Sequence, residues 1–198
     1  MKKAHIVSPA AVVLLYPALF SDQPLLGGYQ PPCGGRRAKH DDIALTLIVA
    51  TYLYLYESGE VRLKLKREGM EAGEDRVYVY PLSPRVWEVS YLTRKLKNVV
   101  KNEGERVSRV VRGDVKVASP AKHFIEKVFE NDVEQLFSTN GVIDCEAVKR
   151  YAEAAKSVKR MLDRYRENNR RLYRALVEEA KKALRDVQER GREAGKGF

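Results

Sequence analysis

One stretch of the sequence, at about residues 46–81, constrains the fold most strongly, because its side chains alternate between apolar and polar. Successive side chains of a β-strand point to opposite faces, so alternation with a period of two predicts strands. Val61, Leu63 and Leu65 alternate with basic residues, and the segment 77–80 alternates valine with tyrosine. The pattern predicts an α+β protein in which a small three-stranded antiparallel meander over this stretch is packed by helices.

The sequence Glu57-Ser58-Gly59, between the first two expected strands, has the form of a three-residue hairpin loop. Gly59 would occupy the third position, where the backbone is left-handed and glycine has no steric cost. A loop of this length pairs Leu55 with Val61 and places the leucines of the first strand on the apolar face. The tyrosines of that strand then lie opposite the basic residues of the second.

A second interpretation of the same stretch is a helix. Residues 42–56 are apolar nearly all round, and periodicity alone does not separate a short buried strand from a buried helix. A helix here, followed by a β-hairpin, would make the protein mainly α-helical with a winged-helix-like hairpin. The β-branched and aromatic content of the stretch favours the strand.

The chain divides at about residue 118 into an α+β domain (1–118) and a helical region (119–198). Ser119-Pro120 has the form of a helix start, with serine as N-cap and proline at the first helical position. The segment that follows is predicted to be an amphipathic helix. Its outer face is expected to carry the acidic residues Glu126, Glu130, Asp132 and Glu134.

A long basic amphipathic helix is expected from about residue 145 to 190, with Asp144 as its N-cap. Its apolar residues recur at alternating intervals of three and four, which is the spacing of a coiled-coil seam. The seam needs a partner, either the chain's own helices or a second copy of the chain. Asn169 falls in the seam, where a polar residue sets register and partner number. The residues expected to mediate self-association are Tyr151, Val158, Leu162, Tyr165, Asn169, Leu172 and Leu176.

The chain carries 37 Lys and Arg against 27 Asp and Glu, which gives a formal net charge of +10. This balance favours attraction to anionic partners such as nucleic acid, and the high Lys, Arg and Glu content is typical of heat-adapted proteins. The apolar run near the N-terminus contains Pro17 and is too short to span a bilayer. We therefore expect a soluble, cytoplasmic protein. Two cysteines are too few for a disulfide framework, so Cys33 and Cys145 are expected to be reduced thiols, with a single bridge between them as the alternative.

No combination of side chains predicts catalysis, so an enzyme is not the favoured class. The sequence has no metal-binding motif, nucleophile elbow or dinucleotide fingerprint, and we expect no cofactor and no metal. The group of Cys33, His40 and Asp41-Asp42 is the nearest to a metal site but lacks ligand spacing. Both this group and Gly34-Gly35-Arg36-Arg37 lie in a long loop expected over residues 21–42, which is rich in glycine and proline. The latter segment could present backbone amides and guanidinium groups to a phosphate.

These features predict a non-catalytic nucleic-acid-binding protein, as a subunit of a larger assembly. Tyrosine rings on a sheet can stack on bases while neighbouring cations hold phosphates, provided that helices do not cover the rings. Arginines along a helix can follow a phosphate backbone. The expected contact residues are Tyr52, Tyr54, Arg62, Lys64, Lys66, Tyr78 and Tyr80 on the meander, Arg36 and Arg37 in the loop, and Arg160, Arg164, Arg171 and Arg174 on the long helix.

Two other classes of function fit the same sequence. A structural or scaffolding protein, such as a coat or filament component, would assemble through the seam. A peripheral adaptor would use the positive charge to bind an acidic membrane.

Overall fold

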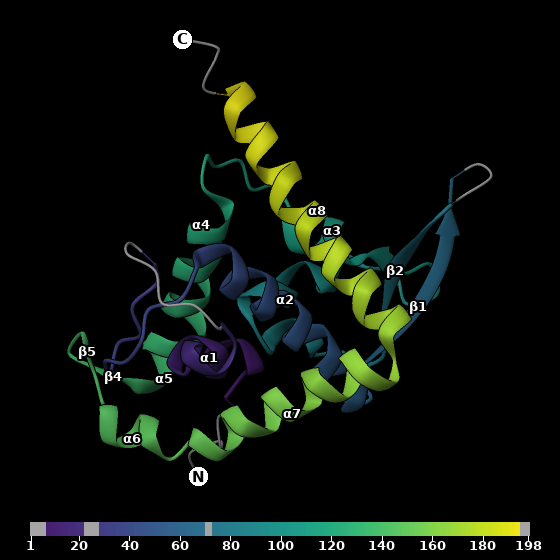
Figure 1. Ribbon diagram of the computed structural model, residues 1–198. Helices are drawn as coiled ribbons and strands as arrows, with labels where there is room; N and C mark the ends of the chain where they lie inside the picture. The colour runs from purple at the N-terminus through teal and green to yellow at the C-terminus, as the bar shows by residue number, and fades with distance from the viewer. Residues whose placement is uncertain (1–6, 22–27, 70–72, 195–198) are drawn as a thin grey trace.

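The computed structural model describes residues 7–21, 28–69 and 73–194 of the 198-residue chain. Helices surround one central helix, and a small antiparallel sheet with a projecting hairpin lies at one side of the molecule (Figure 1). The fold is α+β with a three-stranded sheet and a long C-terminal helix, which confirms the predicted fold class.

In chain order the elements are α1 (Pro9–Leu15), η1 (Pro17–Leu19), α2 (His40–Glu57), β1 (Val61–Glu68), β2 (Glu74–Pro81), η2 (Val86–Glu88), η3 (Tyr91–Asn98), β3 (Glu105–Arg106), α3 (Val107–Arg112), α4 (Pro120–Val128), η4 (Phe129–Glu134), α5 (Gln135–Phe137), β4 (Ser138–Thr139), β5 (Val142–Ile143), α6 (Cys145–Lys149), α7 (Ala152–Asn168) and α8 (Arg170–Ala194). The first three η elements are 3-10 helices, and η4 is a turn of π-helix. The Ser119-Pro120 start of α4 is as predicted.

Helix α2 lies at the centre of the molecule, and the predicted first strand of the meander, at residues 46–56, is wrong. The helix contacts α1, α4, α7, α8 and β1, and ten of its 18 residues are buried. A helix that is apolar all round is stable when other elements surround it in this way. Leucine and tyrosine alternate near the end of α2 because the whole helix is apolar, and the alternation does not indicate a strand. The second interpretation, a helix followed by a β-hairpin, is correct for this segment.

Gly59 has a left-handed backbone, with φ 73°, but it ends helix α2 instead of turning a hairpin. The amide of Glu60 donates to the Leu55 carbonyl at 2.9 Å, and the amide of Gly59 donates to the Tyr56 carbonyl at 3.2 Å. These two bonds form the Schellman arrangement that satisfies the last carbonyls of a helix. The predicted pairing of Leu55 with Val61 is wrong, although the need for glycine was recognised correctly.

Strands β1 and β2 form an antiparallel hairpin in which Leu63 pairs with Val79 and Leu65 with Val77. The predicted alternation is confirmed here, since the valines share a face with the leucines and the tyrosines lie beside the basic residues. The third strand is β3, which is two residues long and pairs with β2. It adds to the edge of β2 that is opposite β1, whereas the strand expected at 46–56 would have paired with β1; β1 is therefore left as an edge strand.

Residues 145–190, which were expected to form one long helix, instead form three helices, α6, α7 and α8. Asp144 is the N-cap, as predicted, and its carboxylate accepts hydrogen bonds from the amides of Glu146 and Ala147 at 3.0 Å. The backbone leaves the helical conformation at Asn169, with φ −132° and ψ 53°. Helices α7 and α8 therefore meet at an angle and contact each other (Figure 1).

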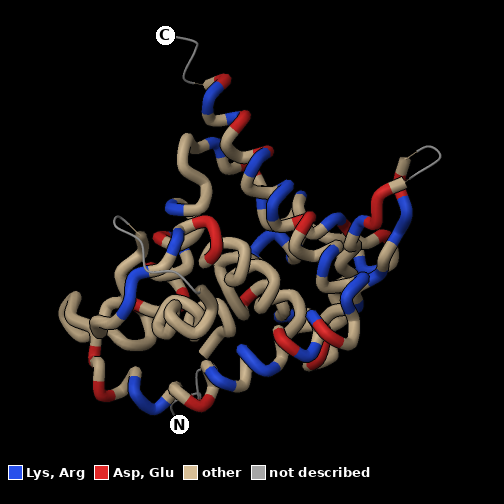
Figure 2. The backbone as a smooth tube through the Cα atoms, in the orientation of Figure 1, with Lys and Arg blue, Asp and Glu red and all other residues tan. Residues whose placement is uncertain are grey.

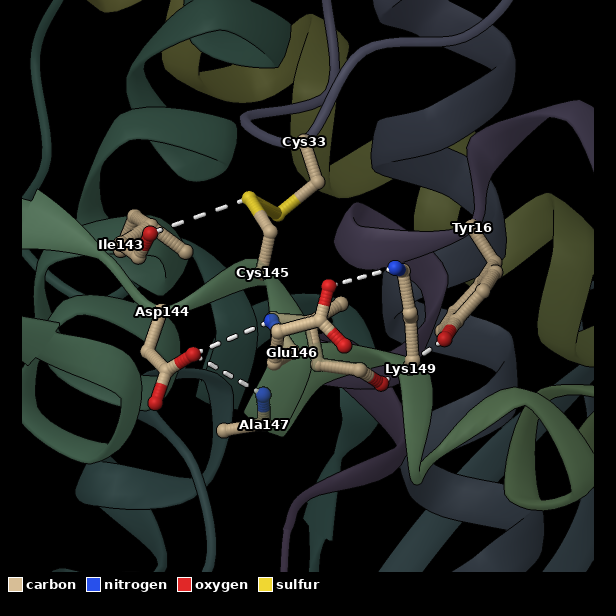
Figure 3. Close-up of a disulfide and its surroundings, with 9 residues drawn as sticks. Tyr16, Cys33, Ile143, Asp144, Cys145, Glu146, Ala147 and Lys149 are labelled. Atoms are coloured by element: carbon tan, nitrogen blue, oxygen red, sulfur yellow. Dashed lines mark hydrogen bonds and ion pairs between the residues drawn. A yellow bond between two sulfur atoms is a disulfide. The ribbon is translucent and has the colours of Figure 1, made fainter.

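Cys33 and Cys145 form a disulfide, with their Cα atoms 5.5 Å apart (Figure 3). It joins the loop before α2 to the first residue of α6, 112 residues further along the chain. Close by, the Tyr16 hydroxyl donates to the Val148 carbonyl at 2.8 Å. The expectation of two reduced thiols is wrong, because the fold brings together two residues whose proximity the sequence does not reveal.

The core is one cluster of buried apolar side chains that includes residues before and after position 118. Helices α1, α2, α3, α4, α7 and α8 all contribute to it. Within the described ranges, no helix is both long enough and apolar enough to cross a membrane.

Candidate functional site

One face of strand β1 carries three exposed cations, Arg62, Lys64 and Lys66, which we call the β1 row. Tyr78 and Tyr80 lie on the same face of the hairpin. The cations cover the rings. The Arg62 guanidinium lies 5.2 Å from the centre of the Tyr80 ring, and the Lys66 ammonium lies 4.0 Å from that of Tyr78. Cation–π contacts of this kind stabilise a hairpin without any ligand, and they leave these rings little surface for stacking on bases.

A turn before β3 covers Tyr80 further. Gly104 has φ 65°, and a Cβ atom built on it would lie 2.6 Å from a carbon of the Tyr80 ring. Glycine is therefore needed both for the backbone conformation and for the close approach. Tyr80 is 4% exposed as a result, and it acts as a packing residue.

The tyrosines expected on the first strand belong to α2. Tyr52 is fully buried, and its hydroxyl donates to the Leu92 carbonyl at 3.2 Å. Burial raises the pKa of Tyr52 above its ordinary value. Tyr54 is half-buried and lines a separate cleft. The prediction of a four-tyrosine platform is wrong, since only Tyr78 and Tyr80 lie beside the β1 row.

A groove of about 780 Å³ lies between the start of β2 and the N-terminal half of α8, and we call it the basic groove. Two predicted contact residues, Arg171 and Arg174, line it. The sequence analysis did not single out the other basic side chains there. The complete charged lining is Arg76, Arg170, Arg171, Arg174, Lys182 and Arg185, with Glu74, Asp75 and Glu178.

Two cations of the basic groove are neutralised by groove carboxylates. Arg171 donates two hydrogen bonds to Asp75, at 2.7 and 2.8 Å, and these bonds lower the pKa of the Asp75 carboxyl. Arg76 pairs with Glu74. Within the described ranges, four groove cations have no carboxylate partner, and we call them the unpaired groove cations: Arg170, Arg174, Lys182 and Arg185.

The inner side of α8 carries Glu179, which is fully buried. Its carboxylate accepts a hydrogen bond from the Ser108 amide at 3.0 Å, and it lies 3.4 Å from the Arg106 guanidinium and 3.8 Å from that of Arg76. Arg106 also lies 3.4 Å from Glu68 at the end of β1. This buried ion cluster joins α8 to the sheet and to α3, and its charges neutralise one another.

The predicted row of four arginines along one helix is divided between two helices, and the prediction is wrong in that respect. Arg160 and Arg164 are exposed on α7, whereas Arg171 and Arg174 belong to α8. Arg164 is also paired with Glu57. Only the two arginines of α8 line the basic groove.

Arg36 and Arg37 are exposed in the loop that precedes α2. That loop lies on the opposite side of the molecule from the hairpin (Figure 1). The Arg37 guanidinium donates to the Gln30 side chain at 2.9 Å, and both Gly34 and Gly35 have positive φ angles. Phosphate binding by this loop stays a prediction, and the loop is separate from the basic groove.

The predicted self-association seam packs inside the chain. Four of its residues belong to the core, namely Val158, Leu162, Leu172 and Leu176. Tyr151 and Tyr165 are half-buried against that core, and Asn169 is exposed where α7 ends. The partner of the seam is therefore the chain's own body, which was one of the two possibilities.

A second hollow, which sequence reasoning missed, is a cleft of about 790 Å³. We call it the η4 cleft, because η4 forms one side of it; the other sides come from the end of α2, from η2 and from the start of η3. Aromatic and basic side chains line it, including Tyr54, Trp87, Tyr91, Arg85 and Arg94.

Asp132, on the π-helical turn, is one of the polar groups of this cleft and is 6% exposed. Its carboxylate accepts hydrogen bonds from the Ser8 hydroxyl at 2.8 Å and from the Tyr91 amide at 3.1 Å. Burial raises the pKa of Asp132. The prediction that Asp132 lies on an acidic outer face is wrong: it follows Val128 by four residues and Phe129 by three, which is the spacing of the apolar face.

In the part of the chain that the structure describes, no group of three or more His, Cys, Asp or Glu side chains is placed to hold a metal ion. Comparisons with protein-family models, with curated proteins and with solved structures gave no match.

Proposed function

We propose that the protein binds nucleic acid through the phosphate backbone, without sequence specificity, and that the basic groove and the β1 row form the contact surface. The observation that carries this proposal is the set of four unpaired groove cations. An arginine that already has a carboxylate must exchange one ion pair for another when it meets a phosphate. An unpaired cation exchanges only water and counterions, so its charge contributes more fully to binding.

The unpaired groove cations are aligned along one side of α8. At about 100° per residue, positions 170, 174, 182 and 185 fall within an arc of roughly 120°. With a rise of about 1.5 Å per residue they extend over roughly 22 Å. That length corresponds to about six base-pair steps of B-form DNA. One face of one helix can therefore follow a single phosphate backbone.

The β1 row adjoins this surface. Lys66 is paired in register with Arg76, and Arg76 lines the basic groove. The exposed cations of the hairpin and of α8 thus meet at this pair of residues. Basic residues are numerous on both elements (Figure 2).

The covered tyrosine rings favour contact with phosphates over contact with bases. Proteins that bind single strands by stacking need exposed rings, and here Tyr78 lies beneath Lys66 and Tyr80 is buried. Duplex nucleic acid also has the higher charge density, so counterion release favours it over a single strand. We therefore expect tighter binding to duplex, with little dependence on base sequence.

Fluorescence anisotropy with a labelled duplex of about 20 base pairs, and with one of its strands, tests the proposal between about 50 and 200 mM salt. Affinity for the duplex should fall steeply as salt rises. The Arg174→Gln/Arg185→Gln variant should bind at least tenfold more weakly at low salt. Its salt dependence should have a slope smaller by about two, one for each lost phosphate contact.

The matched control is Arg160→Gln/Arg164→Gln on α7, which removes the same charge outside the groove. It should weaken binding only slightly. Equal weakening by the two double variants would assign the binding to net charge and would reject the groove. Absence of binding to duplex and to single strand at low salt would reject the whole proposal.

A further inference from the structure

The η4 cleft is a separate site at the other end of the hairpin from the basic groove. Glu60, just before β1, lines the cleft, whereas Glu74 and Asp75 at the start of β2 line the groove. An eight-residue strand separates these two ends by roughly 25 Å. The volume of about 790 Å³ is within the range of small-molecule sites.

Trp87 provides an aromatic surface in this cleft. Its side chain is 37% exposed, and its ring N–H donates to the Pro84 carbonyl at 3.2 Å, which helps to fix the orientation of the indole. Tyr54 and Tyr91 line the same cleft and are half-buried. A large ring with an accessible face and a fixed orientation can stack on a planar heterocycle.

Two guanidinium groups provide positive charge. Arg94 lies 4.9 Å from the centre of the Tyr91 ring and donates to the side-chain oxygen of Asn131. Arg85 is paired with Glu88 at the surface, with 64% of the arginine side chain exposed. The partner of Arg94 is a neutral amide, and a phosphate is a stronger acceptor for a guanidinium because both groups are charged.

Hydrogen-bonding groups for the rest of a ligand are also present. Glu60 and Glu88 line the cleft, and carboxylates commonly accept hydrogen bonds from ribose hydroxyls. The Glu88 carboxylate is paired with Arg85, so Glu60 is the acceptor for the ribose. The exposed amide of Gln135 offers both a donor and acceptors. Asp132 is already engaged by Ser8 and Tyr91, so its role is to hold the wall of the cleft in place.

We propose that the η4 cleft binds a nucleoside 5′-phosphate, with the base against Trp87, the ribose hydroxyls toward Glu60, and the phosphate on Arg94. Arg85 reaches the same phosphate by exchanging its ion pair with Glu88 for the phosphate. The ligand is either a free mononucleotide or an unpaired nucleotide at the end of a strand, because both present the same groups. This site does not depend on the basic groove.

Trp87 is the single tryptophan of the chain, so its fluorescence reports on this cleft alone. Titration with AMP or UMP should change its emission in a saturable way. Adenosine, which lacks the phosphate, should bind at least tenfold more weakly than AMP, and inorganic phosphate should leave the emission unchanged. Equilibrium dialysis with labelled AMP measures binding independently of the emission.

The Arg85→Gln/Arg94→Gln variant should bind AMP at least tenfold more weakly, at a level close to that of adenosine. Arg160→Gln/Arg164→Gln on α7 loses the same charge and should bind AMP as the unmodified protein does. Urea unfolding of both variants establishes that they are folded. A 5′-phosphorylated tetraadenylate distinguishes the two forms of the ligand. If it binds tenfold more tightly than AMP, the ligand is a nucleotide at the end of a strand; if it binds equally or more weakly, the ligand is a free mononucleotide.

The inference is overturned if dialysis shows no AMP bound at millimolar concentration, if AMP and adenosine bind equally, or if the two double variants weaken AMP binding equally. Duplex binding is measured on the same preparations. If the protein binds duplex but not AMP, only the inference about the η4 cleft is overturned. If it binds AMP but not duplex, only the proposal for the basic groove is overturned.

Discussion

The two sides of α8 carry similar charged groups in opposite surroundings. On the inner side, Glu179 is fully buried and is neutralised by Arg106 and Arg76. On the outer side, Arg174 and the other unpaired groove cations face solvent without a carboxylate in the described ranges. The inner charges stabilise the fold because each has a partner within the chain, and the outer charges remain available to a partner outside it.

A net charge of +10 does not by itself locate an anion-binding surface. Arg76 is an example: it lines the basic groove, but only 16% of its side chain is exposed and it pairs with Glu74 and Glu179. A charged group that is paired within the chain contributes to the stability of the fold, whereas one without such a partner is available to bind a ligand of opposite charge. Four changes test this distinction, in decreasing order of their expected effect on the free energy of unfolding.

The largest effect is expected for Glu179→Ala. The change leaves the guanidinium of Arg106 buried without its main counter-charge and the Ser108 amide without an acceptor. Removal of one partner from a buried ion pair costs about 3–5 kcal/mol, which urea unfolding at neutral pH measures. The control is the adjacent, exposed Glu178→Ala, for which a change within about 0.5 kcal/mol is expected. Equal losses in both variants would contradict the distinction.

A smaller loss is expected for the double variant Glu179→Met/Arg106→Met. Two apolar side chains of similar volume replace the charged pair, so no buried charge is left without a partner. The loss in stability should be smaller than the sum of the two single variants by at least about 1 kcal/mol. Urea unfolding of the four proteins in the cycle gives this coupling energy. Additive losses would mean that the two groups do not depend on each other.

Glu68, at the outer end of the buried cluster, should make stability depend on pH. The Tyr78 hydroxyl donates a hydrogen bond to its carboxylate, and this bond, with the charge of Arg106, lowers the pKa of Glu68 below its ordinary value of 4.5. The folded protein then binds fewer protons than the unfolded chain, so this stabilisation is complete above pH 4.5 and is lost as the pH falls through the lowered pKa. Because 37% of the side chain is exposed, solvent screening limits the effect to about 1 kcal/mol.

Urea unfolding from about pH 7 to about pH 3 measures this dependence. The Glu68→Gln variant should lose less stability over that range than the unmodified protein. Identical pH profiles would show that the Tyr78 and Arg106 contacts contribute nothing in solution.

The smallest effect on stability is expected for Arg174→Gln in the basic groove. Because Arg174 has no carboxylate partner in the described part of the chain, the unfolding free energy should change by no more than about 0.5 kcal/mol. The slope of duplex affinity against salt should nevertheless fall by about one. A loss of stability comparable to that of Glu179→Ala would place Arg174 among the structural charges.

Local pattern predicted the fold correctly where neighbouring residues determine the structure. The alternation of Val77 and Val79 with tyrosine gave the faces of β2, and Asp144 was recognised as an N-cap. The same reasoning failed at residues 46–56, because a run that is apolar on every side fits a buried strand and a buried helix equally well. Only the helices that surround α2 decide between them, and they come from distant parts of the sequence.

The candidate sites were predicted only in part for a related reason. Arg171 and Arg174 were identified as contact residues, but the sequence does not show which cations are neutralised; the partner of Arg171 is Asp75, 96 residues away. The η4 cleft was missed although two signals were present. These were a carboxylate, Asp132, at an apolar-face position, and a lone tryptophan, Trp87, close to arginine and proline.

The Cys33–Cys145 bond gives the chain a closed ring with two tails. The ring contains α2 and the whole sheet, and the tails contain α1 on one side and α7 and α8 on the other. A protease that cuts once inside the ring would release no fragment, because the two pieces remain covalently linked through sulfur. They would migrate together on a gel without reductant and separate once the bond is reduced.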